Sequence, residues 1–323
     1  MDSQPRLRWL QAFSLFLLTF LTTTSYGTGF LLSTRTNVVT DLVADPVWLM
    51  VGEPVQFFRS ILQIPWAVWT TPRLLLTGLS FSIPLLIILL AHELGHYLAC
   101  RRHGIPCTLP LFLPAPLLIG TFGAFIRIRA RIPSRRELLD VGAGGPLAGF
   151  VVLLPFLAYG IAMSQVGRVV EIDPDLGGGW LLVPGMSLIG KLLTYLFHGP
   201  LEPGMVLNHH PFSLAAWVGI FVTCLNLVPV GQLDGGHILY AVSPVWSRRL
   251  RPVVLVVVAA LGFFWPGWWL WCGILLLVGR RHPAVSRPAE PLDKRRRIIA
   301  LIALAILVAV FMPNPISVLV ILI

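Results

Sequence analysis

Long apolar stretches limit what this chain can fold into more than any other feature of its sequence. The segment Leu74–Cys100 is largely apolar over its first two-thirds, and further apolar runs occur at Val253–Phe264 and Ile298–Phe311. About 20 apolar residues in a helix cross the hydrocarbon core of a bilayer. Only 12% of the residues are charged, which is about half the share in a typical soluble protein. The sequence therefore predicts a protein that crosses a membrane several times.

The spacing of these stretches predicts an all-α polytopic membrane helical bundle with about six or seven transmembrane helices. The expected spans lie near residues 7–32, 74–100, 138–163, 211–236, 253–264, 267–279 and from 298 onward. The span that starts near Pro211 is expected to continue through Asn226 into the stretch Leu233–Gly236. Residues 314–323 are too few to cross a bilayer alone, and the sequence leaves open whether they enter the membrane.

A small membrane-associated β-hairpin is expected between the second and third spans. Residues Phe125–Arg129 alternate between apolar and basic side chains, as a half-exposed strand does. Several prolines precede them and argue against a helix there. Backbone outside helices is tolerated at membrane depth only against protein or water. We therefore expect the hairpin to dip into the bundle.

Three parts of the chain follow from this organisation. Residues 1–73 hold the first span and an extramembrane loop, with a surface-lying piece at about Val55–Trp69. Residues 74–245 hold the central spans and every polar motif described below. Residues 246–323 hold the C-terminal transmembrane helices.

Basic residues give the chain a net charge of +10 and gather in three clusters. These clusters lie at Arg101–Arg136, Arg248–Arg251 and Arg280–Arg297, beside or between apolar spans. Cytoplasmic loops of membrane proteins carry such positive charge, and no cluster belongs to a recognisable nucleic-acid-binding module. We therefore expect the lipid bilayer, and no nucleic acid, as a partner, with all three clusters on the cytoplasmic side. The N-terminus lacks a Ser/Arg-rich transit segment, and this favours the inner membrane of a bacterium.

The motif HELGH at residues 92–96 lies inside the expected span Leu74–Cys100. On a helix, His92 and His96 are one turn apart on the same face, where both imidazoles can reach one metal ion. Glu93 is one position further round and can contact a metal-bound water. Ionisable residues inside a span are costly and usually functional. The motif predicts a single Zn²⁺ ion about 13 Å along the helix from the basic end at Arg101.

A third ligand is suggested by the one carboxylate that follows an apolar run. A catalytic zinc ion needs a third protein ligand and one open position. Asp234 follows such a run, and Gly235 and Gly236 after it permit a close approach of neighbouring backbone. A lone carboxylate there is costly without a counter-charge, and a cation held by His92 and His96 removes that cost. We predict these two histidines and Asp234 as the metal ligands.

Two motifs together resemble a known family. HELGH at 92–96 and the pattern NxxPxxxLDG at 226–235 resemble the two signatures of the site-2 proteases, which are intramembrane zinc metalloproteases. The segment GAGGPLAG at 142–149 is similar to the small-residue motif of the span between them. The resemblance covers about Leu79 to Val245.

The resemblance implies a role for each matching residue. His92, His96 and Asp234 are implied as metal ligands, Glu93 as the catalytic acid/base, and Asn226 as a substrate-binding or oxyanion-assisting residue. It also implies hydrolysis of peptide bonds in transmembrane protein substrates, expected to be single-pass, near the cytoplasmic side of the membrane. The enzyme class implied is a membrane zinc metalloendopeptidase that acts in regulated intramembrane proteolysis.

Other segments resemble one branch of the family more than the rest. GTFGAFIRI at 120–128 and HHPFSLAAW at 209–217 look most like the cyanobacterial and chloroplast branch. Residues 164–211 are too few for the PDZ domain that many members carry there. A substrate segment is expected to pair with the exposed edge of the strand Gly123–Arg131.

Several polar or small residues have simpler interpretations. Gly145 and Gly149 form a GxxxG pattern, which indicates close packing between helices. His237 is read as an ordinary polar contact rather than as a group that orients a metal ligand. His209 and His210 are expected near the membrane interface and not at the metal.

Three alternatives stay open from the sequence. A CAAX-type membrane metalloprotease resembles the chain in its helix motif, but takes a glutamate as third ligand and lacks the Leu-Asp-Gly run. A metal transporter would bury similar ligands, yet would be expected to show repeated halves. A proteolytically inactive binding protein is disfavoured by the intact Glu93.

Overall fold

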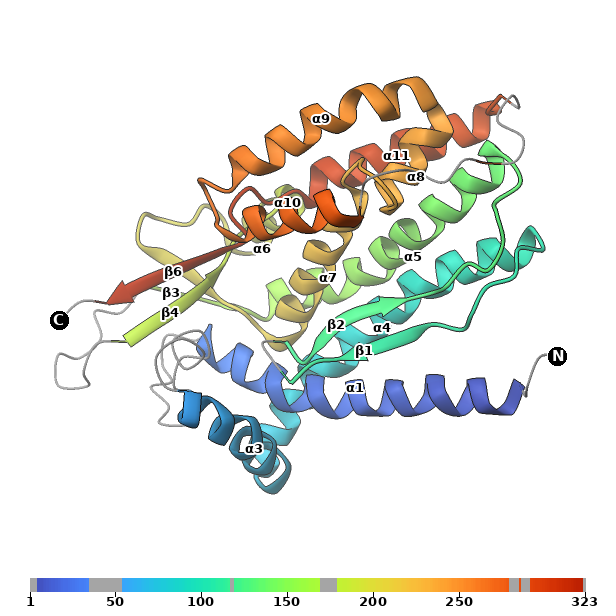
Figure 1. The fold of residues 1–323 in the computed structure, drawn as a ribbon. Coiled ribbons are helices and arrows are strands. Elements are labelled where there is room, and N and C mark those ends of the chain that lie inside the picture. Colours follow the sequence, from blue (N-terminus) through green and yellow to red (C-terminus); the bar gives the residue numbers. More distant parts are fainter. Residues whose placement is uncertain are drawn as a thin grey trace.

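A computed structural model of the chain describes residues 5–34, 54–116, 119–168, 179–278, 285 and 291–321, and most of these are helical (Figure 1). The helices are α1 (Pro5–Ser33), α3 (Pro54–Thr70), α4 (Pro72–Arg102), α5 (Arg135–Ala162), α6 (Leu188–His198), α7 (Pro211–Leu227), α8 (Asp234–Val242), α9 (Pro244–Leu261), α10 (Gly267–Val278) and α11 (Lys294–Val310). The strands are β1 (Leu111–Pro114), β2 (Thr121–Phe125), β3 (Gln165–Arg168), β4 (Gly179–Pro184), β5 (Met205–Asn208) and β6 (Ile316–Ile321).

Three helices of the described part are long and apolar enough to cross a bilayer. They are α1 over Trp9–Ser33, α4 and α5, and two shorter apolar helices, α7 and most of α10, accompany them. A mostly helical bundle with membrane-length helices is thus confirmed. The number of six or seven spans stays a prediction, since several apolar helices are shorter than a bilayer requires.

Helices α4, α5 and α7 pack on one another at the centre, with α1 against α4 and with α11 against both α5 and α7 (Figure 1). Helix α7 is apolar nearly all round, which suits a helix enclosed on every side. The residues that fill this centre are at most 2% exposed and include Leu85, Ile88, Leu153, Leu214 and Ile220.

Glycines set how closely α4 and α5 approach. A Cβ built on Gly95 would overlap the carbonyl oxygen of Gly144, and a Cβ on Gly144 would lie 2.7 Å from the carbonyl oxygen of Gly95. Real side-chain carbons do not approach an oxygen this closely, so only glycine fits at the crossing. Close helix packing was expected at Gly145 and Gly149, and both glycines do lie against α4, the helix of the HELGH motif.

The expected β-hairpin is present and is formed by β1 and β2. The two strands are antiparallel, with Leu111 opposite Phe125 and Pro114 opposite Thr121. Its tip lies against α1, where the hydroxyl of Thr22 donates a 2.6 Å hydrogen bond to the carbonyl of Gly120. Strand β2 ends at Phe125, so the regular strand lies earlier than the alternating residues predicted. Beyond it, pairing continues as a single bridge between Cys107 and Ile128.

Two further strand pairs were not predicted. Strand β3 pairs antiparallel with β5, and β4 pairs antiparallel with β6, whose first residue, Ile316, lies opposite Pro184. Strand β6, which follows α11, therefore pairs with a strand that lies far earlier in the chain. Local sequence pattern does not reveal such pairs, since each strand is short and β6 finds its partner more than a hundred residues earlier.

The structure corrects the expectation of one continuous span from Pro211 into the Leu-Asp-Gly stretch. Helix α7 ends at Leu227 and α8 begins at Asp234. Pro229 disfavours helical backbone at Val228 and lacks an N–H for the helix ladder. The turn between the helices is the element that delivers Asp234.

The helix ends that carry two or more arginines lie on one side of the molecule, at the right of Figure 1. They include the C-terminal end of α4 and the N-terminal ends of α5, α9 and α11. Helices α3 and α6 and the strands β3, β4 and β6 lie toward the opposite side. This asymmetry is the arrangement that the positive-inside rule describes.

Candidate metal centre

The HELGH motif lies on α4, where it faces the interior of the bundle. His92, Glu93 and His96 are all buried, with 4%, 6% and 7% exposure. The ring of His96 is oriented by the backbone of α5, because its Nδ1 lies 2.7 Å from the carbonyl oxygen of Val141. A carbonyl accepts but cannot donate, so Nδ1 carries the proton and Nε2 presents its lone pair to a metal.

Asp234 of α8 meets both histidines, as predicted. Its Oδ2 lies 3.3 Å from Nε2 of His92 and 3.3 Å from Nε2 of His96, and the two Nε2 atoms are 3.2 Å apart. The three donor atoms form a nearly equilateral triangle, in which α4 supplies the two nitrogens and α8 supplies the oxygen.

The triangle fits the coordination shell of zinc. Zn–N and Zn–O bonds of about 2.0–2.1 Å place neighbouring donors of a tetrahedron about 3.3–3.4 Å apart. The observed edges match that value, and these residues form a group that could hold a metal ion. Three protein donors would leave one position of a tetrahedral zinc ion open, which is the pattern of catalytic rather than structural zinc sites.

The turn between α7 and α8 brings Asp234 to this place through close backbone packing. Gly231 adopts a positive φ of 62° inside the turn, which favours glycine. A Cβ on Gly235 would overlap the carbonyl of Leu227, and a Cβ on Gly236 would lie 2.7 Å from that of Val230. The two glycines after Asp234 therefore let α8 start directly against the end of α7.

The far end of α8 is held to α5 by one arginine. Nε of Arg135 donates to the carbonyl of Ala241 at 2.7 Å, and its terminal nitrogen donates to the carbonyl of Val242 at 2.6 Å. Carbonyls at a helix C-terminus lack partners within the helix. This clamp satisfies two of them and fixes the helix that carries Asp234.

Small residues of α5 make the wall behind the two histidines. A Cβ on Gly145 would overlap the ring of His96, and a Cβ on Gly149 would lie 3.2 Å from Nδ1 of His92. The GxxxG pair thus does more than allow helix packing, because it leaves the space in which the metal-facing imidazoles sit. The role of this pair beyond packing was not predicted from the sequence.

Glu93 interacts both with the donor triangle and with the residue that follows the β-hairpin. Its carboxyl interacts electrostatically with His96 and Asp234, and it shares a hydrogen bond with the backbone of Ile126, directly after β2. The hairpin therefore reaches the site. The contacts of Val141 and Ile126 are made by backbone atoms, so no side-chain signal in the sequence could have identified them.

Asn226 also lies at the site, at the end of α7. Its Nδ2 is 3.5 Å from Nε2 of His92, next to the donor triangle. His237 lies elsewhere on α8, with its Cβ toward Gly142 of α5, and is not part of the three-residue metal group.

His209 and His210 are not part of the three-residue metal group, and their place near the membrane interface stays a prediction. They precede α7, where His210 caps the helix by accepting from the N–H of Phe212 at 3.2 Å. His209 is buried and its Nδ1 lies 3.0 Å from the hydroxyl of Ser213. Burial lowers the pKa of His209 to about 4, so this imidazole is neutral at ordinary pH.

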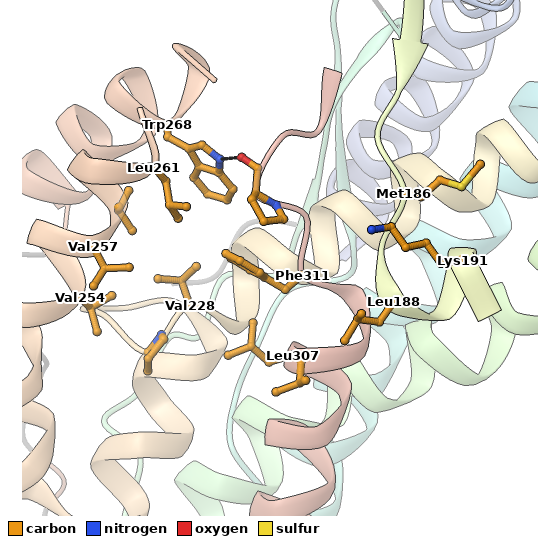
Figure 2. A pocket seen from close by; sticks show the side chains of 14 residues that line it. Met186, Leu188, Lys191, Val228, Val254, Val257, Leu261, Trp268, Leu307 and Phe311 are labelled. Atoms are coloured by element: carbon orange, nitrogen blue, oxygen red, sulfur yellow. Dashed lines mark hydrogen bonds between the residues drawn. The ribbon is translucent and has the colours of Figure 1, made fainter. Parts of the chain in front are cut away.

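An apolar cavity of about 520 Å³ lies behind the α7–α8 turn (Figure 2). Val228 and Pro229 of the turn contribute to its wall, together with residues of α6, α9, α10 and α11. At the edge of the cavity, the indole N–H of Trp268 donates a 2.7 Å hydrogen bond to the carbonyl of Pro313 (Figure 2). None of the metal-facing residues lines this cavity, so it is not the catalytic cleft.

The fold and the site together define a class of protein. A His/His/Asp donor set with a neighbouring glutamate, enclosed by membrane-length helices, is the arrangement of a membrane metalloprotease. The model of peptidase family M50 matches residues 80–265, and the chain belongs to this family. The resemblance to the site-2 proteases is thereby confirmed, and a CAAX-type enzyme or a transporter is not favoured.

Curated relatives agree with this assignment. The chain is 34% identical over 182 residues to "Probable zinc metalloprotease EGY2, chloroplastic" of Oryza sativa subsp. indica. This aligned region covers 55% of the present chain and 31% of that protein. It is 33% identical over 166 residues to "Probable zinc metalloprotease EGY1, chloroplastic" of Arabidopsis thaliana, covering 50% and 29%. The chain thus spans about three-tenths of the length of these relatives. No solved structure matches the chain.

Proposed function

We propose that this protein is an intramembrane zinc metalloprotease that hydrolyses peptide bonds of transmembrane protein substrates. The observation that carries the proposal is the triangle of donor atoms from His92, His96 and Asp234, with edges of 3.2–3.3 Å. The family membership and the zinc metalloproteases among the relatives support the same chemistry.

The three ligands would hold one Zn²⁺ ion, which would supply Lewis-acid chemistry for the activation of water. Glu93 is placed to accept a proton from the attacking water and to return it to the leaving nitrogen. Its carboxyl interacts with Asp234 and His96 and is steadied by the backbone of Ile126. We assign it the role of catalytic acid/base.

Asn226 is proposed to bind the substrate carbonyl. Its Nδ2 group lies beside His92 at the edge of the donor triangle, and an amide N–H can donate to an oxygen that gains negative charge. The β1–β2 hairpin is proposed to hold an unwound substrate segment along the edge of β2. A peptide bond must leave its helix before it can be cleaved, and strand pairing offers it backbone partners.

The site is proposed to face the cytoplasmic side of the membrane. The C-terminal end of α4 and the N-terminal ends of α5, α9 and α11, which each carry two or more arginines, lie on one side of the molecule (Figure 1), and His92 is about 13 Å along α4 from Arg101 at that end. Regulated intramembrane proteolysis of a single-pass substrate is consistent with this depth. The inner membrane of a bacterium stays a prediction.

Residues 74–245 are proposed as the catalytic core. Every side chain assigned a role lies between α4 and α8, and α5 supplies the wall behind the ligands. The preceding residues 1–73 and the following residues 246–323 would then flank the core, contributing α1 against the hairpin and α11 against α5.

The test is zinc content together with cleavage of a model single-pass substrate, measured for purified wild type, Glu93→Gln and Asp234→Ala. We expect one zinc ion per chain and cleavage for wild type. Glu93→Gln should keep zinc and lose cleavage, because it removes a base but no ligand. Asp234→Ala should lose both.

Glu202→Gln is the matched control, since Glu202 is an exposed acid in a loop outside the site. It should retain zinc and cleavage. Normal turnover by Glu93→Gln would refute the assigned base. Full zinc occupancy in Asp234→Ala would refute the ligand set.

A further inference from the structure

A cavity of about 750 Å³ opens between α4, α5 and α11 at the basic side of the molecule. Helix α5 forms its floor, and α4 and α11 stand on either side of it. Its lining residues are Leu98, Ala99, Arg102, His103, Asp140, Ala143, Gly144, Leu147, Asp293, Lys294, Arg295, Arg296 and Ile299.

The cavity is polar at one end and apolar at the other. On each of its three helices, the charged lining residues lie at the basic end of the helix. The apolar ones lie up to two turns deeper, at Leu98 of α4, Leu147 of α5 and Ile299 of α11. From Asp140 to Leu147 the floor runs about 10 Å along α5. This polarity gradient matches an amphiphile that enters from the membrane surface.

One cation of the cavity is neutralised within the protein. Arg296 donates to Asp140 at 2.6 and 2.9 Å and is also paired with Asp293, and His103 lies 2.9 Å from the same Asp140 carboxylate. This network ties α4, α5 and α11 together at the base of the charged end. The lining still carries more positive than negative charge, since it holds four arginines or lysines, Arg102, Lys294, Arg295 and Arg296, against the two carboxylates of Asp140 and Asp293.

Three other cations at the rim have no such partner. Arg102, Lys294 and Arg295 are exposed, and within the described part of the chain their side chains make no hydrogen bond or ion pair. Basic pockets between membrane helices on the positively charged side are suited to lipid headgroups. Guanidinium groups also match phosphate oxygens in geometry.

We infer that this cavity binds an anionic phospholipid, with its phosphate at Arg102, Lys294 and Arg295 and an acyl chain along the apolar floor. The lipid fills the space between α4 and α11. Leu98 and Ala99 of its wall lie within one turn of His96, so the bound lipid supports the back of the metal-bearing helix.

Binding is tested by native mass spectrometry of the full chain in detergent, with phosphatidylglycerol or phosphatidylcholine added. Phosphatidylglycerol should bind one per chain and more tightly than phosphatidylcholine. Lys294→Gln/Arg295→Gln should weaken it about thirty-fold, from about 1 kcal/mol for each basic residue near an anionic surface and 1.4 kcal/mol for each tenfold. Arg102→Gln should weaken it from the opposite wall.

Arg248→Gln/Arg249→Gln is the matched control. It removes two adjacent exposed arginines from the first turns of α9, on the same side of the molecule but outside the cavity. It should bind phosphatidylglycerol as wild type does. Equal losses in both double variants would overturn the inference, because nonspecific surface charge would then explain the binding.

A separate arm distinguishes the lipid from a water-soluble phosphate. Inorganic phosphate and glycerol phosphate carry the same charged group but no acyl chain, and should not displace phosphatidylglycerol at matched concentration. Displacement by either, or equal binding of phosphatidylcholine, would overturn the inference. Proteolytic activity is not needed for any of these measurements, so failure here leaves the proposed catalysis untouched.

Discussion

Replacing Gly145 by alanine should empty the metal site without removing a ligand. The added Cβ would overlap the His96 ring, which is buried and held at Nδ1 by the carbonyl of Val141. The added Cβ would lie 2.1 Å from Nε2 of His96, whereas carbon and ring atoms need about 3.5 Å between them, so the ring must move by about 1.4 Å. Metal–ligand distances tolerate about 0.2 Å. The displaced imidazole should therefore lose its place in the donor triangle.

The substitution should lower the affinity of the site for zinc. Disturbing the groups that orient a metal ligand costs about 10–100-fold in affinity, and displacing the ligand itself should cost at least the upper value. Zinc retention against a chelator, measured on purified protein, reports it directly, and cleavage should fall in parallel. Alanine is about 1 kcal/mol more favourable than glycine inside a helix, so the substitution does not weaken α5 by its own propensity.

Alanine substitutions at two other glycines serve as controls with smaller expected effects. Gly149→Ala places a Cβ 3.2 Å from Nδ1 of His92, a contact that a small shift relieves, and should weaken zinc binding less. Gly273→Ala in α10 meets nothing within 4 Å and should leave it unchanged. Wild-type zinc affinity in Gly145→Ala, or equal losses in all three variants, would contradict the role given to the α5 wall.

Two other predictions follow from the same geometry. Asn226→Ala should retain zinc and cleave about 10²–10³-fold more slowly, as loss of an oxyanion donor does; loss of zinc instead would make Asn226 a group that positions His92. Burial lowers the pKa of His209 to about 4, below its ordinary value. The neutral imidazole therefore favours the folded state above about pH 6.5, and this stabilisation is lost as the pH falls toward 4. The free energy of unfolding should drop by about 2 kcal/mol between pH 7 and pH 5. Thermal unfolding of His209→Gln should depend less on pH, and a pH profile equal to that of the wild type would refute the prediction.

The meeting of His92, His96 and Asp234 could be predicted because their signals in the sequence are local or exceptional. His92 and His96 are one helical turn apart in the sequence, so their convergence needs only the helix itself. Asp234 stood out as a carboxylate after an apolar run, where burial without a cation is costly. Their meeting across two helices depends on tertiary packing, which the sequence pattern implied but did not specify.

Other features depended on contacts that local patterns do not carry. The break between α7 and α8 could have been inferred from Val228-Pro229, since a proline restricts the residue before it. The pairing of β6 with β4 could not, because a short strand has no sequence signal for a distant partner. The hydrogen bonds to Val141 and Ile126 involve backbone atoms that every residue has, so only the fold reveals them.

The central claim is that His92, His96 and Asp234 hold one zinc ion. X-ray absorption at the zinc edge of the purified protein measures this ligand set directly. We expect one ion per chain, with two imidazole nitrogens and oxygen donors at about 2.0–2.2 Å, and loss of this signal in Asp234→Ala. Sulfur at about 2.3 Å, or an identical spectrum in the variant, would contradict the account.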